Sequence, residues 1–313
     1  MLADIIAVAF AMSVGSSKID VKECCTWYDC PIILLGTHRS GTTWLGSFFS
    51  NYPEFAYWEE PRSVWSWGNN YKPDDVLQAK DARPRVSQHI RRRFARFVEE
   101  SGKRRLFEKT PSNCLRVPFI RKIYPNAKIL HVIRDGRSVF SSAEQLMISG
   151  YCRPNVLSRR IGEILVETPF WEWPASFSRL TDITVAKVTK RPMKFWGPRP
   201  KGWRDWVRSD SSNVLLAKQW VASINCAMED TQYMDSQHYY RVKYEDLVSC
   251  PSVTMKAVVD FLEIADAQRL ANRFAETVDV TTQKPWTKLL SSSSLQEIRP
   301  YLEPTIKQLG YEW

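Results

Sequence analysis

The segment that runs from Ile32 to Ser50 constrains the fold more than any other part of the chain. Ile32 to Leu35 is a continuous apolar run that ends in a glycine, which is typical of a buried parallel strand. A turn-rich loop follows, and Thr43 to Ser50 has the apolar periodicity of a helix. Backbone N–H groups and the positive end of the helix dipole meet at such a loop and attract an anion. The predicted phosphate loop consists of Gly36, Thr37, His38, Arg39, Ser40, Gly41, Thr42 and Thr43.

The composition of this loop narrows the class of ligand. Gly36 and Gly41 allow the backbone to approach a phosphate closely, and Arg39 adds a positively charged guanidinium that can donate two parallel hydrogen bonds. The spacing resembles the nucleotide-hydrolase motif GxxxxGK[ST], but Thr42 stands where that motif has its lysine. The missing lysine argues against hydrolysis of ATP or GTP.

Further strands and helices are predicted to alternate along the chain. We expect strands at 105–108, at 127–134 and at 239–243, and helices at 85–100, 115–124, 136–149, 213–235, 251–262 and 295–309. This alternation predicts an α/β fold, a P-loop-like single domain whose central parallel sheet is flanked by helices. Ligands of such sheets bind at the carboxyl ends of the strands, so the loops after Leu35, Glu108 and Ile133 are the expected functional loops.

Two regions fall outside this pattern. Residues 167–210 contain five tryptophans and five prolines without a clear period, and we expect an irregular insertion that forms an acceptor-binding lid, a satellite core, or both. Residues 1–30 form an N-terminal extension before a domain at 31–313. Its short apolar run, 5–14, is expected to pack as a helix rather than to anchor the chain in a membrane.

The seven cysteines are expected to be free thiols in a reducing compartment, with a bridge from Cys24 or Cys25 to Cys30 as the alternative.

The loop sequence GTHRSGTTWL resembles the 5′-phosphosulfate loop of sulfotransferases that use 3′-phosphoadenosine 5′-phosphosulfate (PAPS). Its Arg-Ser-Gly-Thr-Thr core is similar to that of bacterial, carbohydrate and tyrosylprotein members. VIRDGRSVFSS resembles the family's 3′-phosphate motif, in which an arginine precedes a serine by eight residues, and Arg134 and Ser142 fit this spacing. Arg137 is a further candidate at that phosphate.

Two later segments extend the resemblance to the C-terminus. RVKYEDLVSCP is similar to a family segment whose tyrosine lies near the nucleotide, which implies that Tyr244 contacts the donor. TTQKPWTKLL, followed by LGYEW, resembles the family's C-terminal Lys-Trp loop and closing Leu-Gly-Tyr. Lys284 matches the phosphate-binding lysine best, with Lys288 as the alternative because Pro285 separates Lys284 from the tryptophan.

The resemblance also implies three catalytic residues. Sulfuryl transfer needs a base for the acceptor's proton and cations for the sulfonate and the leaving group. Glu60 lies 21 residues after Arg39, as the second glutamate of YWEEP, and matches the glutamate base of the tyrosylprotein branch; Glu59 is the alternative. Glu59 could raise the pKa of Glu60 by like-charge repulsion. Lys109 matches the family's sulfonate-stabilising lysine or general acid, and Arg39 would stabilise the phosphosulfate next to the bond that breaks.

We therefore expect direct in-line transfer of a sulfuryl group from PAPS to a hydroxyl or amine of a small-molecule acceptor. A glycan or protein-tyrosine acceptor is the alternative. The four histidines have no ligand spacing, so no metal is expected. We also expect a cytoplasmic enzyme without a firm membrane anchor and without a nucleic-acid partner, and the oligomeric state stays open.

Two other classes of function explain fewer of these features. A magnesium-dependent, kinase-like enzyme would account for the phosphate loop alone. A polyanion-binding protein would account for the net charge of +10, with the arginine-rich run from Arg83 to Arg96 as its footprint. A solvated helix face is the better account of that run.

Overall fold

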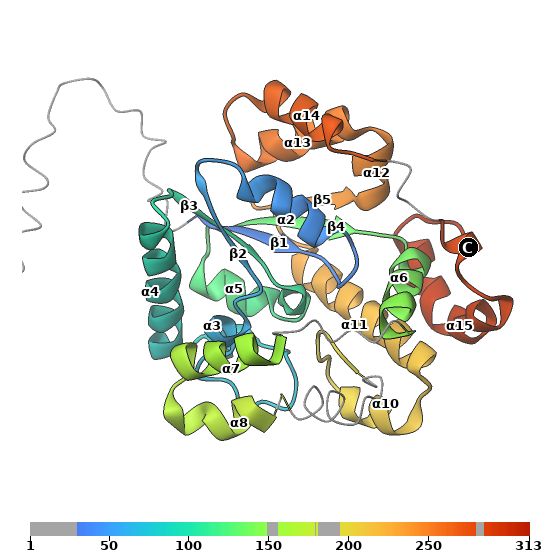
Figure 1. The fold of residues 1–313 in the computed structure, drawn as a ribbon, viewed down its shortest axis with the longest axis horizontal. Helices are drawn as coiled ribbons and strands as arrows, with labels where there is room; N and C mark the ends of the chain where they lie inside the picture. The colour runs from blue at the N-terminus through green and yellow to red at the C-terminus, as the bar shows by residue number, and fades with distance from the viewer. Residues whose placement is uncertain (1–29, 149–155, 179, 181–194, 280–284) are drawn as a thin grey trace, which may run out of the picture.

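A computed structural model describes residues 30–148, 156–178, 180, 195–279 and 285–313. A five-stranded parallel sheet with the order β2-β3-β1-β4-β5 lies at its centre (Figure 1). The strands are β1 (Ile32–Leu35), β2 (Phe55–Glu59), β3 (Arg105–Lys109), β4 (Lys128–Ile133) and β5 (Tyr239–Lys243). The predicted α/β fold is confirmed.

Helices cover both faces of this sheet, which is why every residue of β1, β3 and β4 is buried. Successive side chains of a strand point to opposite faces. On one face, Ile32 and Leu34 pack with Leu45 and Phe49 of α2. The helices on this face are α2 (Thr42–Ser50), α12 (Tyr244–Ser249), α13 (Pro251–Leu262) and α14 (Ala267–Glu276).

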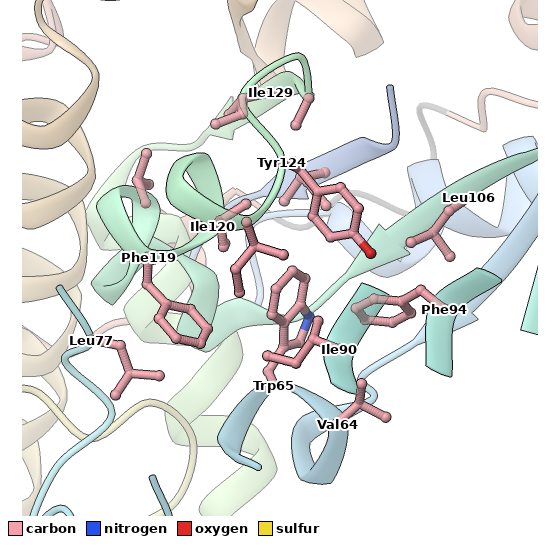
Figure 2. Close-up of a cluster of buried hydrophobic side chains, with 14 of the residues drawn as sticks. Val64, Trp65, Leu77, Ile90, Phe94, Leu106, Phe119, Ile120, Tyr124 and Ile129 are labelled. Atoms are coloured by element: carbon pink, nitrogen blue, oxygen red, sulfur yellow. The ribbon is translucent and has the colours of Figure 1, made fainter. Parts of the chain in front are cut away.

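On the opposite face, Ile33 and Leu35 join a second apolar cluster. Figure 2 shows its centre, where Trp65 lies among Phe94 and Ile120. Its helices are α3 (Arg62–Ser66), α4 (Pro84–Glu100) and α5 (Val117–Ile123). A third cluster lies beyond the end of β4 and joins α6 (Gly136–Ile148), α11 (Ser212–Thr231) and α15 (Ser292–Gln308).

The four predicted strands are present, but β2 was not predicted. Its sequence, FAYWE, is short and has no clear alternation, and its last residue is a glutamate. The register of β2 against β3 sets Glu59 beside Lys109, at the carboxyl ends of both strands. The missed strand therefore carries one of the candidate glutamates and leads directly into the other, Glu60.

The described part of the predicted irregular segment, 167–210, is partly helical. It contains η3 (Phe170–Glu172), α8 (Trp173–Ser178) and α10 (Trp203–Ser209), and α7 (Val156–Glu167) precedes it, whereas residues 179 and 181–194 lie outside the described residues. Tertiary contacts stabilise these short helices: Glu172 accepts hydrogen bonds from the backbone of Gly68 (3.1 Å) and from Asn70 (2.7 Å). Such contacts do not show in local periodicity.

Three short 3₁₀ segments complete the chain's described secondary structure, namely η1 (Ala79–Asp81), η2 (Pro111–Leu115) and η5 (Trp286–Lys288). No helix within the described ranges has both the length and the apolar character needed to cross a bilayer. Among the described cysteines, Cys114, Cys226 and Cys250 are free thiols. The predicted N-terminal helix at 5–14 lies outside the described residues.

Candidate active site

The predicted phosphate loop joins the carboxyl end of β1 to the N-terminus of α2, as expected. Gly41 precedes α2 in the left-handed region, at φ 91°, and no side chain caps the helix. A Cβ at this position would lie 2.6 Å from Cε2 of Tyr244, so only glycine fits both the backbone angle and the space. Arg39 also has a left-handed φ, 64°, which is uncommon for a residue with a side chain.

The predicted donor-binding residues lie in contact with one another. Nε of Arg39 donates to the hydroxyl of Ser142 (2.9 Å), and Nη1 of Arg134 donates to the carbonyl of Arg39 (2.9 Å). The guanidinium of Arg134 lies over the ring of Tyr244, 4.2 Å from its centre. The tertiary structure thus brings together four residues that the sequence motifs proposed separately. Their roles toward the donor stay predictions.

Three polar atoms in this region are buried and have no hydrogen-bond partner within the described part of the chain. They are Oγ1 of Thr37, Nδ1 of His38 and Nε of Arg134. Buried polar groups are rarely left unsatisfied without a reason, and bound phosphate oxygens would supply acceptors for Thr37 and Arg134. The residues present therefore fit a doubly phosphorylated nucleotide at this place.

His38 contributes a neutral imidazole to the loop. Burial lowers its pKa to about 4, and the charges of Arg39 and Arg62 act in the same direction. Its ring lies edge-on to Trp196, with ring centres 4.7 Å apart. His38 thereby connects the phosphate loop to the tryptophan-rich segment.

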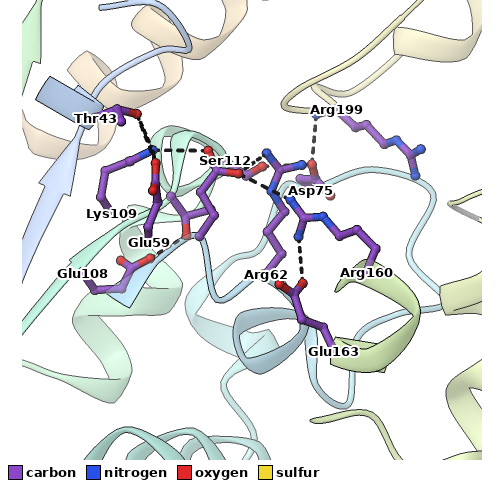
Figure 3. Close-up of polar contacts among 12 residues, drawn as sticks. Thr43, Glu59, Arg62, Asp75, Glu108, Lys109, Ser112, Arg160, Glu163 and Arg199 are labelled. Carbon is purple, nitrogen blue, oxygen red and sulfur yellow. Dashed lines mark hydrogen bonds and ion pairs between the residues drawn. The ribbon is translucent and has the colours of Figure 1, made fainter. Parts of the chain in front are cut away.

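A second cluster surrounds Lys109, whose side chain is only 2% exposed. Its ammonium donates to the hydroxyl of Thr43 (3.0 Å), to Oε1 of Glu59 (3.0 Å) and to Oε1 of Glu60 (3.2 Å), as Figure 3 shows in part. The backbone N–H of Glu60 donates to the carbonyl of Lys109 (2.8 Å). Thr43 belongs to the phosphate loop. The hydrogen bond from Lys109 to Thr43 therefore joins the predicted donor-binding residues to the predicted catalytic residues.

The surroundings of Glu60 differ from the expectation that Glu59 would raise its pKa. Burial would raise the pKa, but the charges of Arg62, Lys109 and Arg160 outweigh burial and hold the pKa of Glu60 well below its usual range. Oε2 of Glu60 lies 2.6 Å from Nη2 of Arg62 and 3.4 Å from Nη2 of Arg160. The expectation was wrong because three cations from β3, α3 and α7 surround this carboxylate.

Sequence reasoning missed both of these arginines. Arg62 follows Glu60 by two residues, at the start of α3, so its proximity in the chain was a usable signal. Arg160 is 100 residues away and lies on α7, which was not predicted, so no local signal pointed to it. Arg160 also pairs with Glu163 at 3.0 Å (Figure 3).

The remaining candidates for the 3′-phosphate site are Arg137 and one of two lysines, Lys284 or Lys288. Arg137 forms a buried ion pair with Asp135 (2.8 Å) and donates to the carbonyl of Glu312 (2.6 Å), so its guanidinium is already bound by protein groups. Lys284 lies outside the described residues, and Lys288 ends η5. The choice between these lysines stays open.

Two observations on the described residues concern the alternative classes of function. No group of three or more histidine, cysteine, aspartate or glutamate side chains in them is arranged to hold a metal ion. In α4, Arg93 pairs with Glu167 (2.7 Å), Arg96 pairs with Glu100 (2.7 Å), and Arg91 donates to the carbonyl of Ile123 (3.0 Å). These three arginines of the predicted polyanion footprint therefore make contacts within the chain.

Comparison with known proteins decides the family. The model of the sulfotransferase family matches residues 31–166 and 182–268, which is well over half of the chain. The chain belongs to the sulfotransferase family. This sulfotransferase is therefore a transferase that moves a sulfuryl group, with PAPS as its co-substrate, as the two phosphate motifs predicted.

Three curated relatives are nematode proteins. Protein-tyrosine sulfotransferase A of Caenorhabditis elegans is 29% identical, over 90% of this chain and 67% of its own length. A putative protein-tyrosine sulfotransferase of Caenorhabditis briggsae is 26% identical over 38% of this chain and 45% of its own length. Another from Caenorhabditis elegans is 31% identical over 32% of this chain and 36% of its own length. The alignments thus span two thirds of the first relative and less than half of the other two.

Solved structures of other sulfotransferases also align with this one. The sulfotransferase domain of the Synechococcus olefin synthase is 17% identical, with a TM-score of 0.47, over 90% of this chain and 95% of that domain. A mouse sulfotransferase complexed with 3′-phosphoadenosine 5′-phosphate (PAP) is 12% identical, with a TM-score of 0.47, over 90% of this chain and 85% of its own.

Proposed function

We propose that this sulfotransferase transfers the sulfuryl group of PAPS to the phenolic hydroxyl of a tyrosine in a peptide or protein. The observation that carries the proposal is the similarity to protein-tyrosine sulfotransferase A, which extends over 90% of the chain. The expectation of a small-molecule acceptor becomes the second candidate. The two share the donor and the catalytic residues and differ only in what carries the hydroxyl.

The charges around Glu60 favour a phenol over an aliphatic alcohol. Arg62, Lys109 and Arg160 hold the pKa of Glu60 low, which makes its carboxylate a weak base. A phenol with a pKa of about 10 gives up its proton far more readily than an alcohol does. A weak base therefore suits a phenolic acceptor, whether that phenol belongs to a tyrosine residue or to a small molecule.

In the proposed reaction, Glu60 takes the proton of the phenol while the phenolic oxygen attacks sulfur. The new S–O bond forms as the bond between sulfur and the 5′-phosphate oxygen of the donor breaks, so PAP leaves. Lys109 is a preorganised cation beside Thr43 of the phosphate loop, where it would offset the negative charge that develops on the leaving oxygen. Transfer of the proton to Glu60 and of the sulfuryl group to oxygen leaves the charges balanced.

The second candidate, a free phenolic metabolite, is supported by the aromatic wall beside the loop. Trp196 packs on His38, and Phe195 stacks on Trp203 with ring centres 5.0 Å apart. Rigid aromatic side chains of this kind bind planar apolar molecules. The same wall could also receive the ring of a tyrosine residue.

Acceptor competition tests the proposal. Purified protein would be given radiolabelled PAPS with a tyrosine peptide, its phenylalanine counterpart, a free phenol and an aliphatic alcohol in parallel. We expect label on the tyrosine peptide and none on the phenylalanine peptide. Label on the free phenol alone or on the alcohol alone would replace the proposal by a small-molecule acceptor. Label on the alcohol alone would also contradict the preference for a phenol.

A further inference from the structure

The last residues of the chain, 309–313, form a C-terminal tail that packs against the predicted donor site. Leu309 is buried in the cluster between α6, α11 and α15, and Tyr311 and Trp313 pack against the same cluster. The sequence motif LGYEW marked this tail, but none of the functional assignments above uses it. Its contacts lead to the residues directly beside Arg134 and Tyr244.

The hydroxyl of Tyr311 links the tail to the ends of two strands. It donates to Oε2 of Glu245 (2.8 Å), and Oε1 of the same carboxylate accepts from the backbone N–H of Asp135 (3.0 Å). Glu245 follows Tyr244 and Asp135 follows Arg134, so this bridge holds the backbone beside both predicted donor contacts. Burial and the nearby Glu245 raise the pKa of Tyr311, so its hydroxyl stays a donor at neutral pH.

Arg137 forms the second link between the tail and the site. Its guanidinium donates to the carbonyl of Glu312 and pairs with Asp135. It also contacts two indole rings, 4.3 Å from the centre of Trp286 and 5.2 Å from that of Trp313. Because α6 begins at Gly136, these contacts fix the first turn of the helix that carries Ser142 two turns later.

We propose that the tail is a positioning element for the donor's 3′-phosphate, because it fixes the strand end that presents Arg134 and the helix start that orients Ser142. The inference rests on the assignment of these two residues to that phosphate and is independent of the acceptor. Tyr311 and Trp313 are thus positioning residues that act on the nucleotide through their neighbours. Their loss should weaken recognition of the 3′-phosphate specifically.

The test compares two nucleotides that differ only in that phosphate. Calorimetric dissociation constants would be measured for PAP and for adenosine 5′-monophosphate, which lacks the 3′-phosphate. Variants would be Tyr311→Phe, which keeps the ring and removes one hydroxyl, and Trp313→Leu. Tyr233→Phe is the matched control, because Tyr233 is 92% exposed. We expect the Tyr311 and Trp313 variants to bind PAP about tenfold more weakly and the monophosphate unchanged.

Two results would overturn this inference. Unchanged binding of PAP would show that the tail does not act on the site. An equal loss for both nucleotides, with a lowered melting temperature, would show a general role in folding. An Arg134→Gln variant tests the underlying assignment of Arg134 to the 3′-phosphate. If this variant lost the same affinity for both nucleotides, Arg134 would not bind the 3′-phosphate. None of these outcomes bears on the acceptor, which the labelling experiment decides separately.

Discussion

The ammonium group of Lys109 lies 3.2 Å from Oε1 of Glu60, although the two residues are 49 positions apart in the chain. The parallel pairing of β2 with β3 creates this proximity, because both strands end at the same edge of the sheet. The proposed proton acceptor and the proposed cation for the leaving group therefore lie within one hydrogen-bond length. Lys109 also donates a hydrogen bond to Thr43 of the phosphate loop.

Replacing Glu60 tests whether its carboxylate is the base. Glu60→Gln keeps the size of the side chain and removes its proton affinity, so turnover should fall about 100-fold or more. Affinity for PAP, measured by calorimetry, should stay the same because the donor residues are untouched. Glu59→Gln is the matched control at the neighbouring position. Should Glu59→Gln lose more turnover than Glu60→Gln, the base would be Glu59.

Replacing Arg160 tests the control of Glu60 by its neighbouring charges. Glu60 must be ionised to act, so activity is lost as the pH falls through its pKa. Arg160→Gln removes one of the three cations that lower this pKa, so the acid limb of the kcat/KM profile should move to higher pH. The other titratable groups around Glu60, namely the neutral His38 and the charged Glu59, Arg62, Asp75, Lys109 and Glu163, stay in place. Arg160→Lys keeps the positive charge and should return the acid limb to its wild-type pH. If the acid limb lies at the same pH in all three proteins, Arg160 does not control the pKa of Glu60.

A methyl group at position 41 should disrupt the contact between the phosphate loop and Tyr244. In Gly41→Ala, the left-handed backbone would cost about 1–2 kcal/mol of stability, and overlap with Tyr244 would add about 1–3 kcal/mol. The affinity of this variant for PAP should also fall, because the phosphate loop would be displaced. Gly102→Ala is the matched control, because Gly102 has φ 64° and no atom within 4 Å of the added carbon. If both variants behave alike in urea unfolding and PAP binding, the contact with Tyr244 has no role.

The buried carboxyl of Glu108 should make stability depend on pH. It accepts hydrogen bonds from Thr110 and from Asn113, yet burial raises its pKa to about 7. Between the ordinary pKa of 4.5 and this value, the folded state binds more protons than the unfolded state. Stability should therefore decrease by about 3 kcal/mol as the pH rises from 4.5 to 7.

Urea unfolding of wild type and Glu108→Gln across this pH range would measure that contribution. The variant should lack the decrease because its amide does not titrate. Glu99→Gln, at an exposed position near the end of α4, should keep it. An unchanged slope in Glu108→Gln would mean that another group causes the pH dependence.

Much of the donor side could be predicted from the sequence because its signals are local. The apolar run before Gly36, the loop and the following helix form one continuous segment, and Arg134 and Ser142 share another. Local patterns also predicted β1, β3, β4 and β5. β1 is the clearest case, because all four of its residues are apolar, as is typical of a buried parallel strand. The structure then showed that the two segments meet, through the hydrogen bond from Arg39 to Ser142.

The acceptor side depends on contacts between distant segments, and there the sequence was less informative. By itself it determined the phosphate loop, the fold class and the candidate Glu60. Only the tertiary structure decided that β2 pairs with β3, that Arg160 approaches Glu60, and that Arg137 binds Asp135 and the C-terminal tail. The physical reason is that a charge acts through space over a few ångströms, so the pKa of Glu60 depends on side chains that only the folded chain brings near it.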